Sequence, residues 1–263
     1  MKNPLRISMG LLSLLLSAVM AASLWMIVSE LYGRQQEQNA FEQLTLLVMP
    51  SEPEESVASI PTGLPTAAIG TDSTEPKPDE RNLIPLFEQN RDCIGWLSIP
   101  GTTLDYPVMH TPEAPLKYLR RDFFGSRSQS GVPFLDWRCT LTDDNLIIYG
   151  HNMKNGTMFA GITAYRDQEY CKAHPVIEFE TEQGCISYTV FAVVRLRKTD
   201  RWYTSLRAED EDSFCLAVAD IQNRSLYNTG ITPSPGQQML TLSTCYGSHD
   251  DDRLVIIGAN LSS

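Results

Sequence analysis

The feature that most limits how this chain folds is an uncharged apolar run from Ile7 to Ser29. As a helix rising about 1.5 Å per residue, this run is about 34 Å long, enough to cross a hydrocarbon core of about 30 Å. Lys2 and Arg6 precede it and acidic residues dominate after it, so the positive-inside rule puts the N-terminus in the cytoplasm. We therefore predict a single-pass protein of the cell membrane, bound to lipid through residues 7–29, with everything after Glu30 outside the cell.

A cleaved secretory signal is the alternative interpretation of this run. The residues Ala21-Ala22-Ser23 resemble a cleavage site, but the apolar stretch is longer than the apolar core of an ordinary signal peptide. The length favours the uncleaved anchor, and either interpretation exports the rest of the chain.

The exported part of the chain is strongly acidic. Of 21 basic and 32 acidic side chains in all, only Lys2 and Arg6 come before Glu30, so residues 30–263 carry 19 basic and 32 acidic groups, a net charge of −13. Such a surface repels a phosphate backbone, so nucleic acid is not expected as a partner.

Changes in composition divide the chain into segments. We expect a cytoplasmic tail, a transmembrane anchor, a juxtamembrane helix, a linker and a globular domain at residues 1–6, 7–29, 30–49, 50–81 and 82–263. The juxtamembrane helix is indicated by the helical spacing of Phe41, Leu44 and Val48. The linker is indicated by Pro50–Asp79, which holds six prolines and no aromatic residue and therefore has little with which to form a core.

Short strand-like runs separated by Gly, Pro, Asn and Asp fill the globular domain. One amphipathic helix is expected from about Ala208 to Gln222. Its apolar positions are Phe214, Leu216, Val218 and Ile221. Eight strands with few helices predict a mostly β fold, a closed or nearly closed eight-stranded β-barrel. The predicted strands are Trp96–Ile99, Leu104–Val108, Val132–Leu135, Leu146–Tyr149, Val176–Glu180, Ile186–Leu196, Met239–Ser243 and Leu254–Ile257.

Six cysteines in an exported domain raise the question of disulfides, which their spacing leaves open. They are Cys93, Cys139, Cys171, Cys185, Cys215 and Cys245. There is no Cys-x-x-Cys pair and no Cys/His cluster at ligand spacing, so neither a metal nor another cofactor is expected.

Three residues at the ends of predicted strands are candidates for chemistry. His151 follows an apolar run and a glycine, Cys245 ends a β-rich run, and Arg253 opens the last strand eight residues later. Separately, each has an ordinary interpretation: a loop histidine, a buried cysteine and a strand-start arginine. If the segment between Cys245 and Arg253 is a hairpin loop, these two residues face each other on adjacent strands. A nucleophile, a base and a cation together are what acyl transfer through a thioester requires.

Several segments of the domain resemble those of one family. They are Asn90-Arg-Asp-Cys-Ile-Gly-Trp96, Thr103-Leu-Asp-Tyr-Pro-Val108, Gly131-Val-Pro-Phe-Leu-Asp136, Tyr149-Gly-His-Asn-Met153, Met158-Phe159, and Thr241-Leu-Ser-Thr-Cys245 with Arg253. Together with the helix near residues 208–222 and the anchor and linker that precede the domain, they are similar to the segments of class B sortases. The resemblance implies that residues 82–263 are a sortase catalytic domain with an eight-stranded barrel.

The resemblance also implies an activity. A cysteine transpeptidase of this family cleaves secreted proteins after the Thr of a C-terminal sorting motif and transfers the acyl group to an amine of a cell-wall peptidoglycan precursor or of a pilin. Cys245 would form the thioester, His151 would protonate the leaving amine and later deprotonate the incoming one, and Arg253 would hold the substrate and support the oxyanion. A thiol with a pKa of about 8.5 needs a neighbouring cation to ionise, and Arg keeps its charge at every relevant pH.

The resemblance further implies which residues line the substrate groove. By position in the matching segments they are Ser243, Tyr149, Leu119, Trp202 and Tyr203, although ordinary packing is the alternative for each. The sequence departs from the family at two places that concern substrate choice. Pro115 stands where a polar residue is common, and the loop before Arg253 is short and acidic.

Two other functions remain open from the sequence. A non-enzymatic, membrane-anchored wall or adhesion protein would have no need for Cys245, His151 and Arg253 together. A cysteine peptidase would use the same residues but would only hydrolyse its substrate.

Overall fold

The computed structural model describes residues 4–48 and 81–262, and the predicted linker lies almost wholly outside them. The first described element is the helix α1 (Pro4–Val48). Its segment Leu12–Gly33 is long and apolar enough to cross a membrane, and none of it is buried. The predicted anchor and the predicted juxtamembrane helix are two parts of this one helix, because no proline lies between Leu5 and Val48 to end it.

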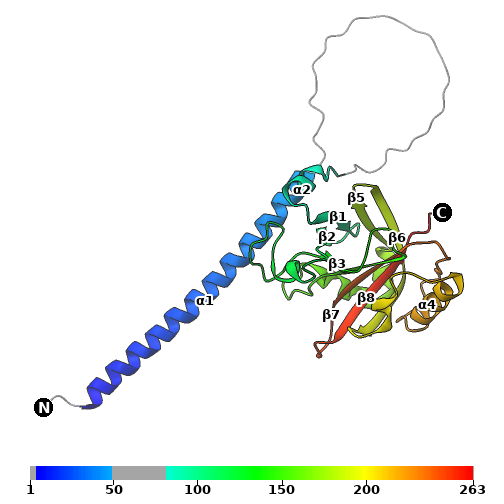
Figure 1. The fold of residues 1–263 in the computed structure, drawn as a ribbon. Coiled ribbons are helices and arrows are strands. Elements are labelled where there is room, and N and C mark those ends of the chain that lie inside the picture. Colours follow the sequence, from blue (N-terminus) through cyan, green and yellow to red (C-terminus); the bar gives the residue numbers. More distant parts are fainter. Residues whose placement is uncertain (1–3, 49–80, 263) are drawn as a thin grey trace, which may run out of the picture. The chain divides into compact units, whose positions relative to one another are not determined.

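Eight strands form the globular domain. They are β1 (Cys93–Ser98), β2 (Asp105–Met109), β3 (Phe134–Leu135), β4 (Asn145–Tyr149), β5 (Val176–Thr181), β6 (Gly184–Arg197), β7 (Met239–Cys245) and β8 (Asp252–Ala259). They close into a barrel in the order β1-β2-β3-β4-β7-β8-β6-β5 (Figure 1). The predicted barrel and all eight predicted strands are confirmed, with strand ends that differ by no more than three residues.

Two pairs of neighbouring strands, β2–β3 and β4–β7, run parallel, and the other six pairs are antiparallel. The β4–β7 pair matters most for the site, because the C-terminal ends of two parallel strands meet at the same edge of a sheet. These two strands are joined by about ninety residues of intervening chain, so their pairing is purely tertiary.

Short helices connect the strands. They are α2 (Ile84–Gln89), η1 (Lys117–Arg120), η2 (Phe159–Arg166), α3 (Gln168–Ala173), η3 (Arg201–Thr204) and α4 (Glu211–Asn223). Both η2 and η3 contact β7, so residues on both faces of this strand are buried. For this reason, the residues of β7 are buried almost continuously instead of alternating between buried and exposed.

The helix α4 begins three residues later than predicted. Asp210 has an extended backbone and its side chain accepts a hydrogen bond from the Ser213 N–H at 2.7 Å, while the Ser213 hydroxyl accepts one from the Asp210 N–H. This reciprocal cap makes Asp210 the N-cap residue, so the helix begins at Glu211 and Ala208 lies outside it. The apolar pattern was also wrong at Leu216, which is 72% exposed, because only Phe214, Val218 and Ile221 share the buried face.

Candidate active site

The parallel pairing of β4 and β7 brings two of the three candidate residues to one edge of the barrel. The last pair in register is Tyr149 with Ser243, and His151 and Cys245 each lie two residues further along. Side chains two residues apart on a strand point to the same face, so the register puts His151 level with Cys245.

Three hydrogen bonds hold the two chain segments together beyond the last paired residues. The Gly150 N–H donates to the Ser243 carbonyl at 3.2 Å, and the Thr244 hydroxyl donates to the Gly150 carbonyl at 2.8 Å. The Asn152 side-chain amide then donates to the Cys245 carbonyl at 3.0 Å. The segment that carries His151 is therefore bound to the segment that carries Cys245 on both sides of the histidine.

Gly150 allows the turn that leads into His151. A Cβ atom at this position would lie 2.5 Å from Cγ of Phe159, whose ring is fully buried. The Phe159 N–H in turn donates to the His151 carbonyl at 2.8 Å. Only a residue without a side chain fits between Tyr149 and His151, which gives the glycine of this motif a steric reason.

The antiparallel pairing of β7 and β8 places Cys245 directly opposite Arg253, as the sequence predicted. Nη1 of Arg253 donates to the carbonyls of Asp250 and Asp252 at 2.6 and 2.8 Å. A guanidinium carries five N–H donors, so these contacts orient the side chain and leave donors for a substrate. The acidic loop before Arg253 therefore orients the Arg253 side chain through the backbone carbonyls of Asp250 and Asp252.

The side chain of His151 is half-buried and bound to the segment η1. Its Nε2 lies 2.9 Å from the Leu119 carbonyl, and a carbonyl only accepts, so Nε2 carries a proton. Burial lowers the pKa of His151 below its usual value, the Leu119 carbonyl opposes this, and the Arg120 charge lowers the pKa further. The ring is therefore neutral near pH 7, and its Nδ1 is the nitrogen that can accept a proton.

None of the six cysteines forms a disulfide, and they differ in accessibility. Cys93, Cys139 and Cys171 are buried, and burial raises the pKa of Cys93 and of Cys139 to about 12. Cys245 is exposed at the end of β7, as are Cys185 and Cys215 elsewhere. Exposure together with the His151 and Arg253 neighbours distinguishes Cys245 from the other five thiols.

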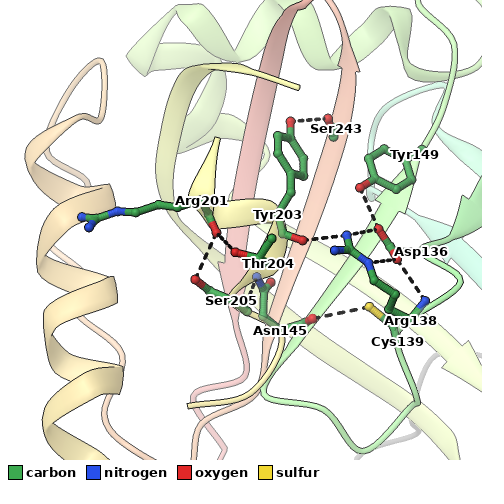
Figure 2. Close-up of polar contacts among 10 residues, drawn as sticks. All are labelled: Asp136, Arg138, Cys139, Asn145, Tyr149, Arg201, Tyr203, Thr204, Ser205 and Ser243. Carbon is green, nitrogen blue, oxygen red and sulfur yellow. Dashed lines mark hydrogen bonds and ion pairs between the residues drawn. The ribbon is translucent and has the colours of Figure 1, made fainter. Parts of the chain in front are cut away.

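A polar network centred on the buried Asp136 lies beside the site and joins three of the predicted groove residues (Figure 2). The Tyr149 hydroxyl donates to Asp136 at 2.9 Å, and Arg138 donates to both oxygens of Asp136 at 2.9 and 2.8 Å. Nη2 of Arg138 also donates to the Tyr203 carbonyl at 2.7 Å. The Tyr203 hydroxyl lies 2.8 Å from Oγ of Ser243, and its ring stacks on that of Tyr149 with centroids 6.1 Å apart.

The predicted groove residues differ in how far they are open to a ligand. Ser243, Trp202 and Tyr203 are only 1%, 3% and 5% exposed, whereas Tyr149 and Leu119 are half-exposed. Nε1 of Trp202 donates to the Thr241 hydroxyl at 3.1 Å, which fixes η3 against β7. The structure therefore joins Tyr149, Tyr203 and Ser243 directly, places Leu119 against His151, and buries Ser243, Trp202 and Tyr203 beneath the surface.

The sequence analysis missed Asp136, Arg138 and Asn152. A charged pair directly after the apolar strand β3 was the available signal for the first two, since strand ends commonly carry site residues. Their hydrogen-bond partners could not be predicted from the sequence, because Tyr149 and Tyr203 come from distant parts of the chain. Within residues 4–48 and 81–262, no group of three or more His, Cys, Asp or Glu side chains is arranged to hold a metal ion.

Comparisons with known proteins identify the family of this barrel. The sequence model of the sortase domain matches residues 97–261. Sortase B of Listeria monocytogenes is 33% identical over 177 residues, which cover 66% of this chain and 71% of that protein.

Solved structures agree with the sequence relatives. A Staphylococcus aureus sortase B–substrate complex is 27% identical with a TM-score of 0.63, covering 68% of this chain and 84% of that one. A sortase B complexed with triglycine is also 27% identical with a TM-score of 0.62, covering 68% and 85%. The chain belongs to the sortase family, and its relatives place it in class B. It is a cysteine transpeptidase.

Proposed function

We propose that Cys245, His151 and Arg253 carry out the transpeptidation. The supporting observation is the meeting of their three strand ends, with Cys245 paired to Arg253 and with the His151 segment bound to the Cys245 segment. In the first step, Nδ1 of the neutral His151 takes the thiol proton and the Cys245 sulfur attacks the substrate carbonyl. The C–N bond then breaks, the leaving amine takes the proton from His151, and a thioester remains.

The second half of the reaction repeats these steps in reverse with another amine. The incoming amine attacks the thioester carbonyl and gives a proton to His151. The new C–N bond forms, the C–S bond breaks, and the sulfur recovers its proton. Arg253 binds the substrate and stabilises the oxyanion that forms in each half, since its charge persists at every relevant pH.

The proposed substrates are secreted proteins with a C-terminal sorting motif, cleaved after its Thr. The proposed acceptor is an amine of a cell-wall peptidoglycan precursor or of a pilin. The relatives solved with a substrate and with triglycine support both halves, because triglycine offers a terminal amine. We further propose that Tyr149, Leu119, Ser243, Trp202 and Tyr203 shape the groove for the motif, the last three from beneath its surface.

The test uses the full chain in detergent micelles with fluorogenic peptides taken from secreted proteins that end in candidate sorting motifs. Cys245→Ala should abolish cleavage and the thioester adduct seen by mass spectrometry. Cys215→Ala is the matched control, because that thiol is also exposed but lies on α4, and it should keep full activity.

Addition of free triglycine separates transfer from hydrolysis. A ligated product is expected in the presence of this amine. Hydrolysis without ligation would favour the peptidase alternative, and cleavage by the Cys245→Ala variant would refute the proposed nucleophile.

We also propose that the chain is anchored in the cell membrane through residues 7–29, with the tail 1–6 in the cytoplasm and the domain 82–263 outside. The support is the apolar segment Leu12–Gly33 and the basic residues before it. Protease added to intact protoplasts should remove the domain, and a domain that is protected until lysis would contradict this orientation.

A further inference from the structure

A groove of about 710 Å³ with a basic lining includes residues of η1 and of the segments on either side of it. We call it the basic groove, and its residues are Ala114, Pro115, Leu116, Lys117, Arg120, Arg121 and Arg127. Four of its seven residues are cationic, on an exported part whose net charge is −13. A local concentration of positive charge on an acidic surface focuses the electrostatic potential at that place and attracts anions.

Three of the four cations form no ion pair within the described part of the chain. Lys117 is paired with Asp92 at 2.5 Å, but no carboxylate pairs with Arg120, Arg121 or Arg127. Arg120 and Arg121 each use one Nη1 to donate to a backbone carbonyl, at 2.8 and 2.7 Å. These contacts orient the guanidinium groups and leave most of their five N–H donors available.

The backbone holds two of these like charges next to each other. Arg121 and Arg127 form an antiparallel β-bridge, which places their side chains opposite each other. Like charges in this position destabilise a folded chain, and Asp122 between them uses its carboxylate on the Ser126 N–H at 2.7 Å. A bound anion would relieve this repulsion.

The basic groove adjoins the catalytic residues through η1. The Leu119 carbonyl contacts His151, and the next residue, Arg120, lies close enough for its charge to act on the same imidazole. Pro115, the residue that departs from the family pattern at the substrate groove, also lines the basic groove. The segment η1 therefore carries both a lining residue of the basic groove and the carbonyl that contacts His151.

We propose that the basic groove binds an acidic segment of the protein substrate that flanks the sorting motif. This proposal rests on the function proposed above and adds a specificity element to it. Arginine forks bind carboxylates with two parallel hydrogen bonds. The apolar part of the lining, which includes Leu116 at 66% exposure, suits a peptide better than a compact phosphate.

The first measurement is the binding of fluorescein-labelled hexaglutamate to the full chain in neutral detergent micelles, followed by fluorescence anisotropy. The triple variant Arg120→Ala, Arg121→Ala, Arg127→Ala should bind about ten-fold more weakly, since each exposed ion pair contributes a factor of up to about five. All three side chains are exposed, so the fold should be unchanged.

A charge-matched control separates the effect of the basic groove on hexaglutamate binding from the effect of the net charge. The variant Arg91→Ala, Lys154→Ala, Lys172→Ala removes three exposed cations elsewhere and should bind within about two-fold of the wild type. Cys245→Ala should bind hexaglutamate like the wild type although it cannot turn over. A failure of the catalytic proposal is thereby distinguishable from a failure of this one.

The second measurement links the groove to the substrate. A peptide that the wild type cleaves is extended on either side of its motif by three glutamates or by three glutamines. The glutamate extension should raise kcat/KM several-fold in the wild type. The double variant Arg121→Ala, Arg127→Ala, which leaves Arg120 beside His151 in place, should lose most of this preference while it cleaves the glutamine peptide normally. Equal hexaglutamate affinity in wild type and triple variant, preference for inorganic pyrophosphate over hexaglutamate, or no effect of the glutamates on kcat/KM would each overturn the proposal.

Discussion

Asp136→Asn tests whether the buried network beside the site supports catalysis. The Asp136 side chain is 4% exposed and accepts four hydrogen bonds, two at each oxygen. An asparagine keeps one acceptor oxygen, but its amide group faces donors from Arg138 and Tyr149. The substitution therefore removes the negative charge opposite Arg138 and at least one charge-assisted hydrogen bond.

The expected magnitude follows from these contacts. Hydrogen bonds to charged groups contribute about 1.5–3 kcal/mol each, and removing one partner of a buried ion pair costs about 3–5 kcal/mol. Arg138 is 33% exposed and partly screened by water, so the lower end, about 3 kcal/mol, is appropriate. For a domain of this size that is a fall of about 6–12 °C in the unfolding midpoint.

Tryptophan fluorescence during thermal unfolding measures the stability, and peptide cleavage measures the catalytic effect. We expect kcat/KM to fall by up to about 100-fold, because Tyr149 loses its charged acceptor and Arg138, which donates to the Tyr203 carbonyl, loses the carboxylate that orients it. Asp143→Asn is the matched control, since Asp143 is also buried and binds Thr140 and Arg207 at the far end of β4.

The Asp143→Asn control should lower the midpoint of thermal unfolding. At a temperature where this variant is folded, its kcat/KM should equal that of the wild type. A midpoint for Asp136→Asn within about 2 °C of the wild type would refute the energetic reasoning. Wild-type kcat/KM in a destabilised Asp136→Asn variant would show that the network has only a structural role.

Three further predictions concern the same edge of the barrel. Arg253→Lys should fold normally yet lose about 100- to 1,000-fold in turnover, because lysine lacks the fork that binds substrate and oxyanion together; near wild-type turnover at any pH would contradict this. Gly150→Ala should lose activity because its Cβ would displace the Phe159 ring. Gly161→Ala, where a Cβ meets nothing within 4 Å, should keep its activity, and kcat/KM of both variants tests the comparison. Burial alone would raise the pKa of Asp136, but the hydrogen bonds from Arg138 and Tyr149 hold this pKa below its usual value. The contribution of the Asp136 carboxylate to stability should therefore be lost as pH falls below about 4. Acid unfolding of the wild type and of Asp136→Asn measures this loss.

The individual elements of this protein were predictable because their signals are local. Each strand is a short apolar run bounded by turn residues, and each predicted run became a strand of the barrel. The pairing of Cys245 with Arg253 was also predictable, since β7 and β8 are joined by a short loop and must be neighbours. The boundary of α4 was missed because the cap at Asp210 depends on a side-chain hydrogen bond that apolar periodicity does not reveal.

The relation of His151 to Cys245 could be expected only through the family resemblance. It depends on the parallel pairing of β4 with β7, and no local pattern specifies which distant strands pair. The burial of Trp202 and Tyr203 against β7 also depends on contacts between distant parts of the chain. The resemblance implied that both residues line the substrate groove, with ordinary packing as the alternative.

The sequence by itself therefore determined the apolar membrane-length segment and the strands, because composition and short-range periodicity carry that information. Its motifs also supplied the proposed nucleophile, base and cation. Only the tertiary structure decided that burial lowers the pKa of His151 and that Asp136 joins Tyr149 to η3 through Arg138. Each of these depends on burial or on contacts between residues far apart in the chain. Such contacts exist only once the barrel has closed.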